Sequence, residues 1–365
     1  MPTLDTELVR TPTKTNIHIA LDPANSVLNS MHIMHMADQF SGLNEWITKT
    51  AASLSPEQLR TNRLIFEGLH YAIQPRRRWS SFPAYVDHLE NQNPLVLRDR
   101  ILAAYDDLCC ETEVHTGERS DPEVVLASLD SFLDHLREGF PADVINIEIE
   151  TEAYSLLVDP PTLREKIVSH FRTMWRDVMS AEWERNLPML ETCVAANQQL
   201  DLTNLTIPEA AQQIMGQALP EKWQDKFSKA QIDEVIFVPS AHLGPYRGMA
   251  HIDGILWLMF GARLPEGAQI SSPDLSRSEL LVRLNALADD TRLQILHALK
   301  MEGELCSKDI MEQLELSQSA ASRHLKQLSA TGYLGERRKN GAKCYSLSED
   351  RVEDTLEALS YFLLG

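Results

Sequence analysis

Residues 277–365 show a regular succession of short helical patterns, and this succession limits the possible folds more than any other feature of the chain. Four segments have apolar residues three and four positions apart, which is the spacing of one buried helical face. These segments are 279–288, 292–300, 307–314 and 318–330. Asp289, Asp290 and Thr291 offer N-cap residues for the second helix, and Ser317 can cap the fourth. Gly303 and Gly332 can end these two helices. A small domain of short helices around one core is therefore expected.

The third and fourth of these helices are separated by a tight turn, which predicts a helix-turn-helix. In the fourth helix, Ala321, Leu325 and Leu328 share one apolar face. The residues on its other faces are Gln318, Ser319, Ser322, Arg323, Lys326 and Gln327. A helix with such polar residues in its first two turns can enter the major groove of DNA, where Gln and Arg side chains contact base edges.

A basic turn follows the fourth helix. The strand-like runs 333–336 and 342–347 flank Asn340 and Gly341, a pair typical of a β-hairpin turn. Cations at the tip of such a hairpin would lie on phosphates and position the protein without reading sequence. The basic residues of this turn are Arg337, Arg338, Lys339 and Lys343. A last helix is expected over 349–364.

The distribution of charge supports contact with nucleic acid, although the whole chain has a net charge of −19. Residues 277–365 contain 12 basic and 14 acidic residues, whereas residues 1–276 contain 22 basic and 39 acidic residues. Within 317–343 there are six basic residues and one acidic residue, Glu336. The acidity therefore belongs to the large N-terminal part, and the basic patch coincides with the helix-turn-helix and its hairpin.

The sequence of residues 289–348 closely resembles the ArsR/SmtB family of winged-helix repressors. Its most specific pieces are SQSAASRHLKQL (317–328) and DDTRLQIL (289–296). The resemblance implies a homodimer that binds a near-palindromic double-stranded DNA operator, with repression expected and activation left open. The residues that it places on DNA are Ser317, Gln318, Ser319, Ser322, Arg323, His324 and Lys326 in the helix and Arg337, Arg338, Lys339 and Lys343 in the wing. Each residue taken singly could be ordinary solvated surface, but their ordered arrangement favours DNA binding.

Members of this family often bind metal through a Glu-Leu-Cys-x-Cys-Asp pattern, which this sequence only partly matches. Cys306 occupies the first thiolate position, but Lys308 stands at the second and cannot replace a soft ligand. The last predicted helix contains no His. The five cysteines include no CxxC pair and indicate neither a disulfide framework nor a zinc site. We therefore expect no metal and no cofactor, and expect Cys306 to pack as a small apolar residue.

The chain as a whole predicts a mainly α protein with small β elements: a helical N-terminal domain followed by a C-terminal winged helix-turn-helix. The expected parts are a flexible N-terminus (1–14), a mostly helical domain (15–263), a Pro-, Gly- and Ser-rich linker (264–276) and the winged domain (277–365). The helical domain is expected to sense an unknown small-molecule effector or to contribute to dimerisation.

Several elements of the N-terminal region can be predicted from local patterns. Residues 16–20 alternate as in a short strand, and 122–138 have the apolar spacing of one helix. Thr206 begins a capping-box pattern and should start another helix. The runs 234–239 and 251–260 are β-branched and aromatic, so they predict two strands, which could pair as a hairpin.

Two clusters in the N-terminal region could bind a ligand. His32 and His35 have the HxxH spacing of a helical metal pair, but no further ligand is evident and core packing is the favoured interpretation. Arg76–Arg78 with Trp79 could bind an anion or contact DNA beside the operator, whereas a solvated basic turn is favoured.

A third cluster, His242 and His251 with Tyr246 and Arg247, could line a small-molecule pocket, but a solvated loop is favoured. The motifs GxSxG, GxGxxG, Walker A and HExxH are absent, so we expect no catalytic residues and no enzyme. An enzyme or a protein-interaction domain joined to a DNA-binding module remains the alternative.

No apolar run approaches the ~18–20 residues that a membrane span needs. The first residues also lack the apolar core of a signal peptide. The expected protein therefore makes no membrane contact and is cytoplasmic.

Overall fold

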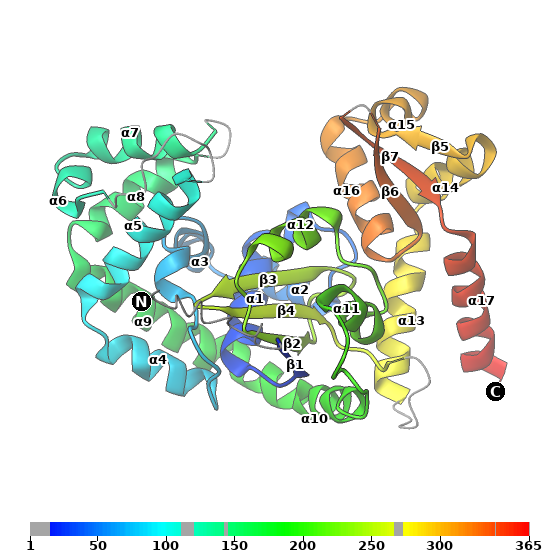
Figure 1. Cartoon of the computed structure of the whole chain (residues 1–365), viewed down its shortest axis with the longest axis horizontal. Coiled ribbons are helices and arrows are strands. Elements are labelled where there is room, and N and C mark those ends of the chain that lie inside the picture. Colours follow the sequence, from blue (N-terminus) through cyan, green and yellow to red (C-terminus); the bar gives the residue numbers. More distant parts are fainter. Residues whose placement is uncertain (1–14, 111–119, 142–144, 266–272, 340, 365) are drawn as a thin grey trace, which may run out of the picture. The chain divides into compact units, whose positions relative to one another are not determined.

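The computed structural model describes residues 15–110, 120–141, 145–265, 273–339 and 341–364 (Figure 1). It is largely helical with two small sheets, which confirms the predicted mainly α class. The chain divides into two compact units, one of residues 22–187 and one of residues 1–21 and 188–365. The divisions at 14, 263 and 276 stay predictions. No helix among the described residues has the length and apolar character that a membrane crossing requires.

The unit of residues 22–187 is helical. Its α-helices are α1 (Pro23–His35), α2 (Glu45–Ser53), α3 (Pro56–Glu67), α4 (Phe82–Asn91), α5 (Pro94–Cys110), α6 (Pro122–Val125), α7 (Leu129–Gly139), α8 (Ile147–Leu157) and α9 (Pro160–Met174). Short helical turns are η1 (Ala37–Gln39), η2 (His70–Ile73) and the π-helical η3 (Trp175–Met179), and α10 (Ser180–Asn197) crosses the boundary between the units.

Local caps explain where these helices begin. Asp22, Ser55, Ser81 and Asp159 each accept a backbone N–H of the following first turn, which satisfies a donor that has no partner inside the helix. The helices then bury aromatic side chains against one another, with the Phe82 and Phe171 rings 5.7 Å apart.

The prediction of one helix over 122–138 is wrong. The structure has α6 and α7 there, separated by residues 126–128. The Ser128 hydroxyl accepts the backbone N–H of Ser131 at 3.1 Å and so starts a new helix. The apolar spacing continues across the break, which is why the pattern alone suggested one helix.

A four-stranded sheet lies in the other unit. Its strands are β1 (Asn16–Ile19), β2 (Glu234–Ser240), β3 (Arg247–Ile252) and β4 (Ile255–Gly261), in the order β1-β2-β4-β3. The predicted strands at 16–20 and 234–239 are confirmed. The predicted hairpin between 234–239 and 251–260 is wrong, because β2 pairs with β4 in parallel.

The hairpin of this sheet is β3–β4, which turns at Asp253 and Gly254. Both residues have positive φ, 51° and 78°, as an Asp-Gly hairpin turn requires. Helices α11 (Ile207–Met215) and α12 (Glu221–Lys229) contribute to the core of the sheet, in which Ile214 and Phe237 are fully buried. The capping box predicted at Thr206 is present at the start of α11.

The C-terminal residues form a winged helix-turn-helix, as predicted. Its elements are α13 (Pro273–Leu287), α14 (Asp290–Glu302), β5 (Glu304–Cys306), α15 (Ser307–Gln313), α16 (Gln318–Ala330), β6 (Leu334–Lys339), β7 (Ala342–Leu347) and α17 (Glu349–Leu364). The strands pair antiparallel in the order β5-β7-β6. Helix α13 begins at Pro273, inside the segment predicted to be a linker.

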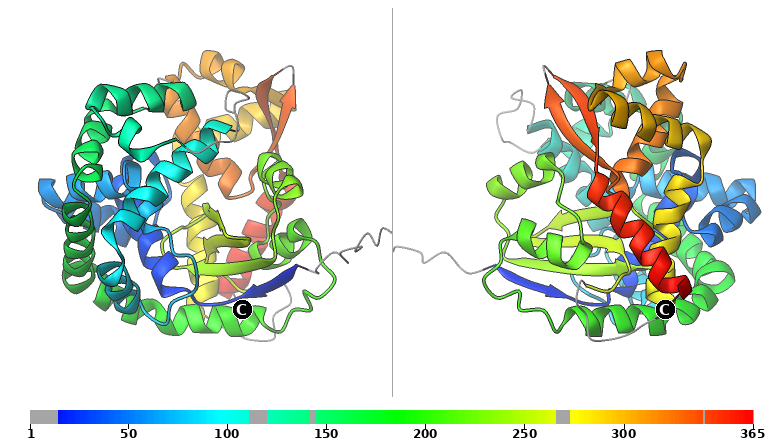
Figure 2. Two further views of the ribbon diagram at one scale, coloured as in Figure 1. Left: turned by 60° about the vertical axis from the view of Figure 1, so that its left-hand side comes forward. Right: turned by 90° about the vertical axis from the view of Figure 1, so that its right-hand side faces the viewer.

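One small core holds this winged part together. Ile295, Leu325 and Leu328 are buried in it, and so is Tyr333 at the start of the wing. The Tyr333 hydroxyl donates to Thr355 Oγ1 at 2.9 Å, which connects the wing to α17. The views in Figures 1 and 2 show α17 (red) beside α13 (yellow), and the two helices pack together.

Candidate nucleic-acid interface

Helix α16 exposes the polar residues expected to read DNA. Ala321, Leu325 and Leu328 are buried in the core. The Ser317 hydroxyl accepts the Ala320 backbone N–H at 3.2 Å and fixes the first turn, which contains no acidic residue. The exposed predicted residues are Ser317, Gln318, Ser319, Ser322, Arg323 and Lys326. The N-terminal half of α16 is therefore available to an anionic partner.

The structure corrects the expectation for His324. His324 is only 8% exposed, and its Nδ1 lies 3.6 Å from Oδ1 of Asp289, which is the N-cap of α14. Burial lowers the pKa of His324, and the Arg292 and Arg323 guanidinium groups add to this effect against the opposing Asp289 carboxylate. The neutral imidazole packs inside the domain and does not join the exposed face.

Lys326 is exposed but is engaged within its own unit. Its Nζ lies 5.8 Å from the centre of the Tyr246 ring, within the range of a cation–π contact. Burial lowers the pKa of Lys326, with a smaller contribution from Lys222. A role for Lys326 on DNA stays a prediction.

The wing carries its predicted cations on exposed positions, but acids balance most of them. Arg337 forms an ion pair with Glu304 of β5, and Lys339 Nζ lies 3.6 Å from the same carboxylate. Lys343 Nζ lies 2.8 Å from Glu336. Within the described part of the chain, Arg338 has no ion pair. The role of Glu304 was missed because the sequence places it 33 residues from Arg337.

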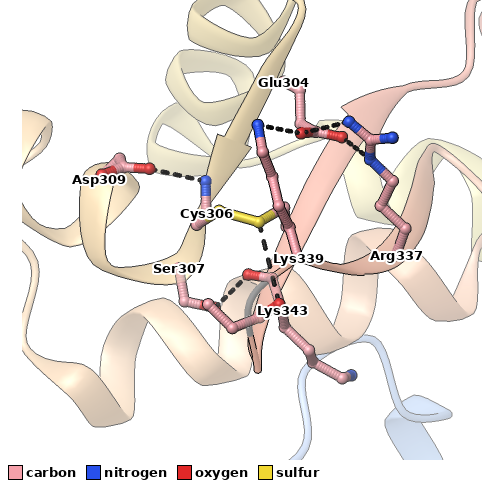
Figure 3. Close-up of a disulfide and its surroundings, with 9 residues drawn as sticks. Glu304, Cys306, Ser307, Asp309, Arg337, Lys339 and Lys343 are labelled. Atoms are coloured by element: carbon pink, nitrogen blue, oxygen red, sulfur yellow. Dashed lines mark hydrogen bonds and ion pairs between the residues drawn. A yellow bond between two sulfur atoms is a disulfide. The ribbon is translucent and has the colours of Figure 1, made fainter.

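A disulfide connects the wing to the helix-turn-helix, as Figure 3 shows. Cys306 of β5 and Cys344 of β7 are directly opposite in the antiparallel pairing and are bonded to each other. The expectation that Cys306 only packs is therefore wrong, and so is the expectation of no disulfide. Beside the bond, the Asp309 carboxylate accepts the Cys306 backbone N–H at 2.9 Å and Ser307 Oγ donates to the Lys343 carbonyl at 3.4 Å. The start of α15 is thus fixed to the wing.

The surface of α17 is unusually apolar. Tyr361 is 78% exposed and Leu364 83% exposed, while Leu281 of α13 is also exposed. Thr355, on the side of α17 that meets Tyr333, is fully buried. The other exposed apolar residues of α17 are Leu356, Phe362 and Leu363. Several exposed large apolar side chains on one helix are typical of a protein–protein interface.

The histidine pair of α1 does not form a metal centre in the described residues. The ring centres of His32 and His35 are 5.1 Å apart, and burial lowers the pKa of His35 to about 3. No group of three or more His, Cys, Asp or Glu side chains in the described ranges could hold a metal ion. Both imidazole rings pack against the ring of Phe66, as the core-packing interpretation predicts.

The segment between β2 and β3 is not the solvated loop that we favoured from the sequence. His242 and Tyr246 are buried, at 5% and 7% exposure. Arg247 donates from Nη1 to the Ala218 carbonyl at 2.6 Å. These contacts fix the segment within its own unit.

Residues 289–334 match the family described as "Bacterial regulatory protein, arsR family". The chain is 34% identical over 96 residues to the transcriptional activator HlyU of Vibrio cholerae, which covers 26% of this chain and 88% of HlyU. It is 33% identical over 86 residues to an arsenical resistance operon repressor of Staphylococcus aureus, which covers 24% of this chain and 82% of that repressor.

A cadmium resistance regulator of Staphylococcus aureus, the CadC homolog, is 39% identical over 72 residues, which is 20% of this chain. The chain spans 60% of the length of that relative and 48% of the arsenic resistance regulator ArsR1 of Pseudomonas putida. Among solved structures, NolR of Sinorhizobium fredii aligns with 34% identity and a TM-score of 0.21, over 26% of this chain and 94% of NolR.

Proposed function

Because the chain belongs to the ArsR family of bacterial regulatory proteins, we propose that it is a DNA-binding transcriptional regulator, and that it represses from a near-palindromic operator as a homodimer. The observation that carries this proposal is the surface of α16. Its first two turns expose polar residues and Arg323, contain no carboxylate, and begin at the positive end of the helix dipole. The whole chain has a net charge of −19, so a face with an arginine and no carboxylate is a local exception.

In this proposal the first turns of α16 enter the major groove. Gln318 and Arg323 have the side chains that make bidentate contacts to adenine and guanine edges, each worth about 1–3 kcal/mol of discrimination against the wrong base. Ser317, Ser319 and Ser322 are short enough to bring the helix backbone close to the DNA. The proposal omits His324, because its imidazole is buried.

The wing would contact phosphates next to the groove. Arg338 is exposed and can bind a phosphate directly. Arg337 and Lys339 would exchange Glu304 for phosphate, as Lys343 would exchange Glu336. Such exposed ion pairs are worth only about 0–1 kcal/mol, so DNA competes for these cations at little cost.

The exposed apolar surface of α17 and Leu281 supports the homodimer. A second copy on this surface would remove the exposed aromatic and aliphatic side chains from water. A two-fold axis there would present two α16 helices, and their half-sites would lie ~34–36 Å apart on one face of the duplex.

The unit of residues 22–187 would receive the regulatory signal. It is a separate compact unit with its own aromatic core, so it can bind an effector without being part of the DNA surface. An effector changes DNA binding only if its affinity differs between the DNA-competent and incompetent states of the dimer.

Selection from a random DNA pool tests the proposal. We expect the full chain to enrich a near-palindromic sequence, and we expect a variant with Gln318→Ala and Arg323→Ala to enrich none. Gln313→Ala, at the end of α15, is the matched control and should enrich the wild-type sequence. Failure of the wild-type chain to enrich any sequence would contradict the assignment of α16.

A further inference from the structure

A small cavity lies in the unit of residues 22–187, where the segment after η2 meets α4 and α5. Its volume is about 230 Å³, a little below the ~300 Å³ at which pockets for larger ligands begin. Polar residues that line it include Arg76, Arg77, Trp79, His88, Gln92 and Arg100. The size suits a compact molecule with a few non-hydrogen atoms.

Basic groups dominate this cavity. Among the described residues that line it there are three arginines and no Asp or Glu. The two acids of the nearby part of α4 are engaged by another helix, since Arg172 of α9 binds Glu90 at 2.6 Å and Asp87 at 3.2 Å. The Tyr85 hydroxyl, on another lining residue, donates to the Ile73 carbonyl. Burial raises the pKa of Tyr85; Arg100 opposes this rise, and the Asp22 carboxylate adds a smaller contribution to it. A positive concave site in a chain of net charge −19 is a local exception.

Contacts between the lining residues hold the cationic groups in place. The Arg77 guanidinium carbon lies 4.1 Å from the centre of a Trp79 ring, and the His88 ring centre lies 4.6 Å from Trp79. The Gln92 side-chain amide donates to His88 Nε2 at 3.0 Å, and Arg100 Nη2 donates to Gln92 Oε1 at 3.3 Å. The groups are therefore arranged before any ligand arrives, which lowers the entropic cost of binding.

Two residues of the lining carry further hydrogen-bond donors. Trp79 Nε1 is buried and has no hydrogen-bond partner in the described part of the chain. Burial lowers the pKa of His88, and the Arg77 and Arg100 guanidinium groups lower it further. A neutral His88 that accepts at Nε2 carries its proton on Nδ1 and can donate there.

We propose that this cavity binds a small anion, through a carboxylate or phosphate group held by Arg77, Arg76 and the Trp79 indole N–H. Planar guanidinium groups match the paired oxygens of both kinds of anion. The site goes beyond DNA binding and deepens the proposed effector input. A role of the bound anion as an effector of DNA binding rests on the proposed function, but anion binding itself does not.

Calorimetric titration of the full chain tests the site, with inorganic phosphate, benzoate and the neutral benzamide as probes. We expect saturable binding of phosphate or benzoate at millimolar or lower concentration and none of benzamide. Which of the two anions binds more tightly assigns the ligand class. Absence of binding by both anions, or equal binding of benzamide, overturns the proposal.

Arg77→Gln is the decisive variant, and Arg78→Gln is its matched control. Both belong to the same run of three arginines, but Arg78 does not line the cavity. We expect Arg77→Gln to weaken anion binding about tenfold or more, because a charge-assisted bidentate contact is lost, and Arg78→Gln to change it little. Equal losses of anion affinity in both variants would show that only the net charge of the surface matters, and would overturn the site.

A second variant guards against misfolding. Trp79→Phe keeps an aromatic ring under Arg77 and removes the Nε1–H donor. Weaker anion binding by a folded Trp79→Phe chain supports the site, and unchanged binding contradicts it. DNA titrations of the same proteins separate the two proposals. A chain that binds its operator but no anion refutes the cavity alone, and a chain that binds an anion but prefers no DNA sequence refutes the regulator alone.

Discussion

Removal of the disulfide between Cys306 and Cys344 should destabilise the DNA-binding region strongly. The bond joins residues 38 positions apart and closes a loop that contains α15, α16, β6 and the start of β7. In the chain-entropy treatment of cross-links, a loop of this length contributes about 4 kcal/mol at 25 °C. Since whole domains have ~5–15 kcal/mol of stability, this is a large fraction. The double variant Cys306→Ser, Cys344→Ser should therefore open this region far more often.

Hydrogen exchange followed by mass spectrometry measures the effect within the full chain. Peptides from 307–343 should exchange several hundred-fold faster in the double variant, because each 1.4 kcal/mol is a factor of ten. Peptides from α3 (Pro56–Glu67), in the other unit, should not change. A reducing agent should reproduce the effect in the wild-type chain and have none on the double variant.

Cys193→Ser provides the matched control for loss of a thiol. Cys193 is a free, buried cysteine, and it lies in α10, away from the wing in the sequence. Its replacement should leave exchange in 307–343 unchanged. Exchange rates in that segment within about threefold of wild type after loss of the disulfide would refute the loop-closure reasoning.

Three further perturbations follow from the same structure. Arg323→Ala should cost about 1–3 kcal/mol of operator affinity and relax the base preference in a binding-site titration. Arg338→Ala should instead weaken binding to all DNA and reduce the dependence of affinity on salt. Equal effects of the two variants would contradict the assignment of Arg323 to a base and of Arg338 to a phosphate. Ser317→Ala should remove the N-cap of α16 and cost about 1 kcal/mol in a denaturant titration, and an unchanged midpoint would show that the cap contributes nothing. Burial lowers the pKa of His35 to about 3 and of His70 to about 4, from an ordinary value of 6.5. Below pH 6.5 the unfolded chain therefore binds more protons than the folded chain. The stability that these two neutral rings contribute above pH 6.5 is lost as the pH falls. Between pH 7.5 and pH 5 each histidine should lower the free energy of unfolding by about 2 kcal/mol. Urea unfolding followed by tryptophan fluorescence would detect this change. Equal stability at both pH values would show that the folded chain does not bury these two rings in their neutral form.

The helices of the winged region were predictable because their limits are set locally. The predicted segments 318–330 and 349–364 coincide with α16 and α17, since Ser317 caps the former by a bond to its own first turn. The short strand β5 was not predictable, because three residues become a strand only by pairing with β7. The disulfide depends on the same pairing.

Non-local pairing also limits what could be predicted of the four-stranded sheet. Strand β1 pairs in parallel with β2, more than two hundred residues away, and no local pattern contains this information. The turn at Asp253 and Gly254 does carry a local signal, an Asp-Gly pair between apolar runs, but the run 251–260 was interpreted as one strand.

The candidate DNA surface was predictable in its composition but not in its details. The burial of His324 follows from the helical spacing, since it lies three residues after Ala321 and four before Leu328, which are both in the core. The spacing could have excluded His324. The ion pairs of Glu304 with Arg337 and Lys339 could not be predicted, because they require the strand register.

A gel-shift titration on the DNA upstream of its own gene tests the central claim most directly. The full chain is titrated at two salt concentrations, with scrambled DNA of the same composition as the control. We expect the complex with the upstream DNA to be tighter than the complex with scrambled DNA, and to weaken at the higher salt concentration because phosphate contacts release counterions. Equal affinity for both DNAs across the two salt concentrations would contradict the proposal that α16 reads sequence in that DNA.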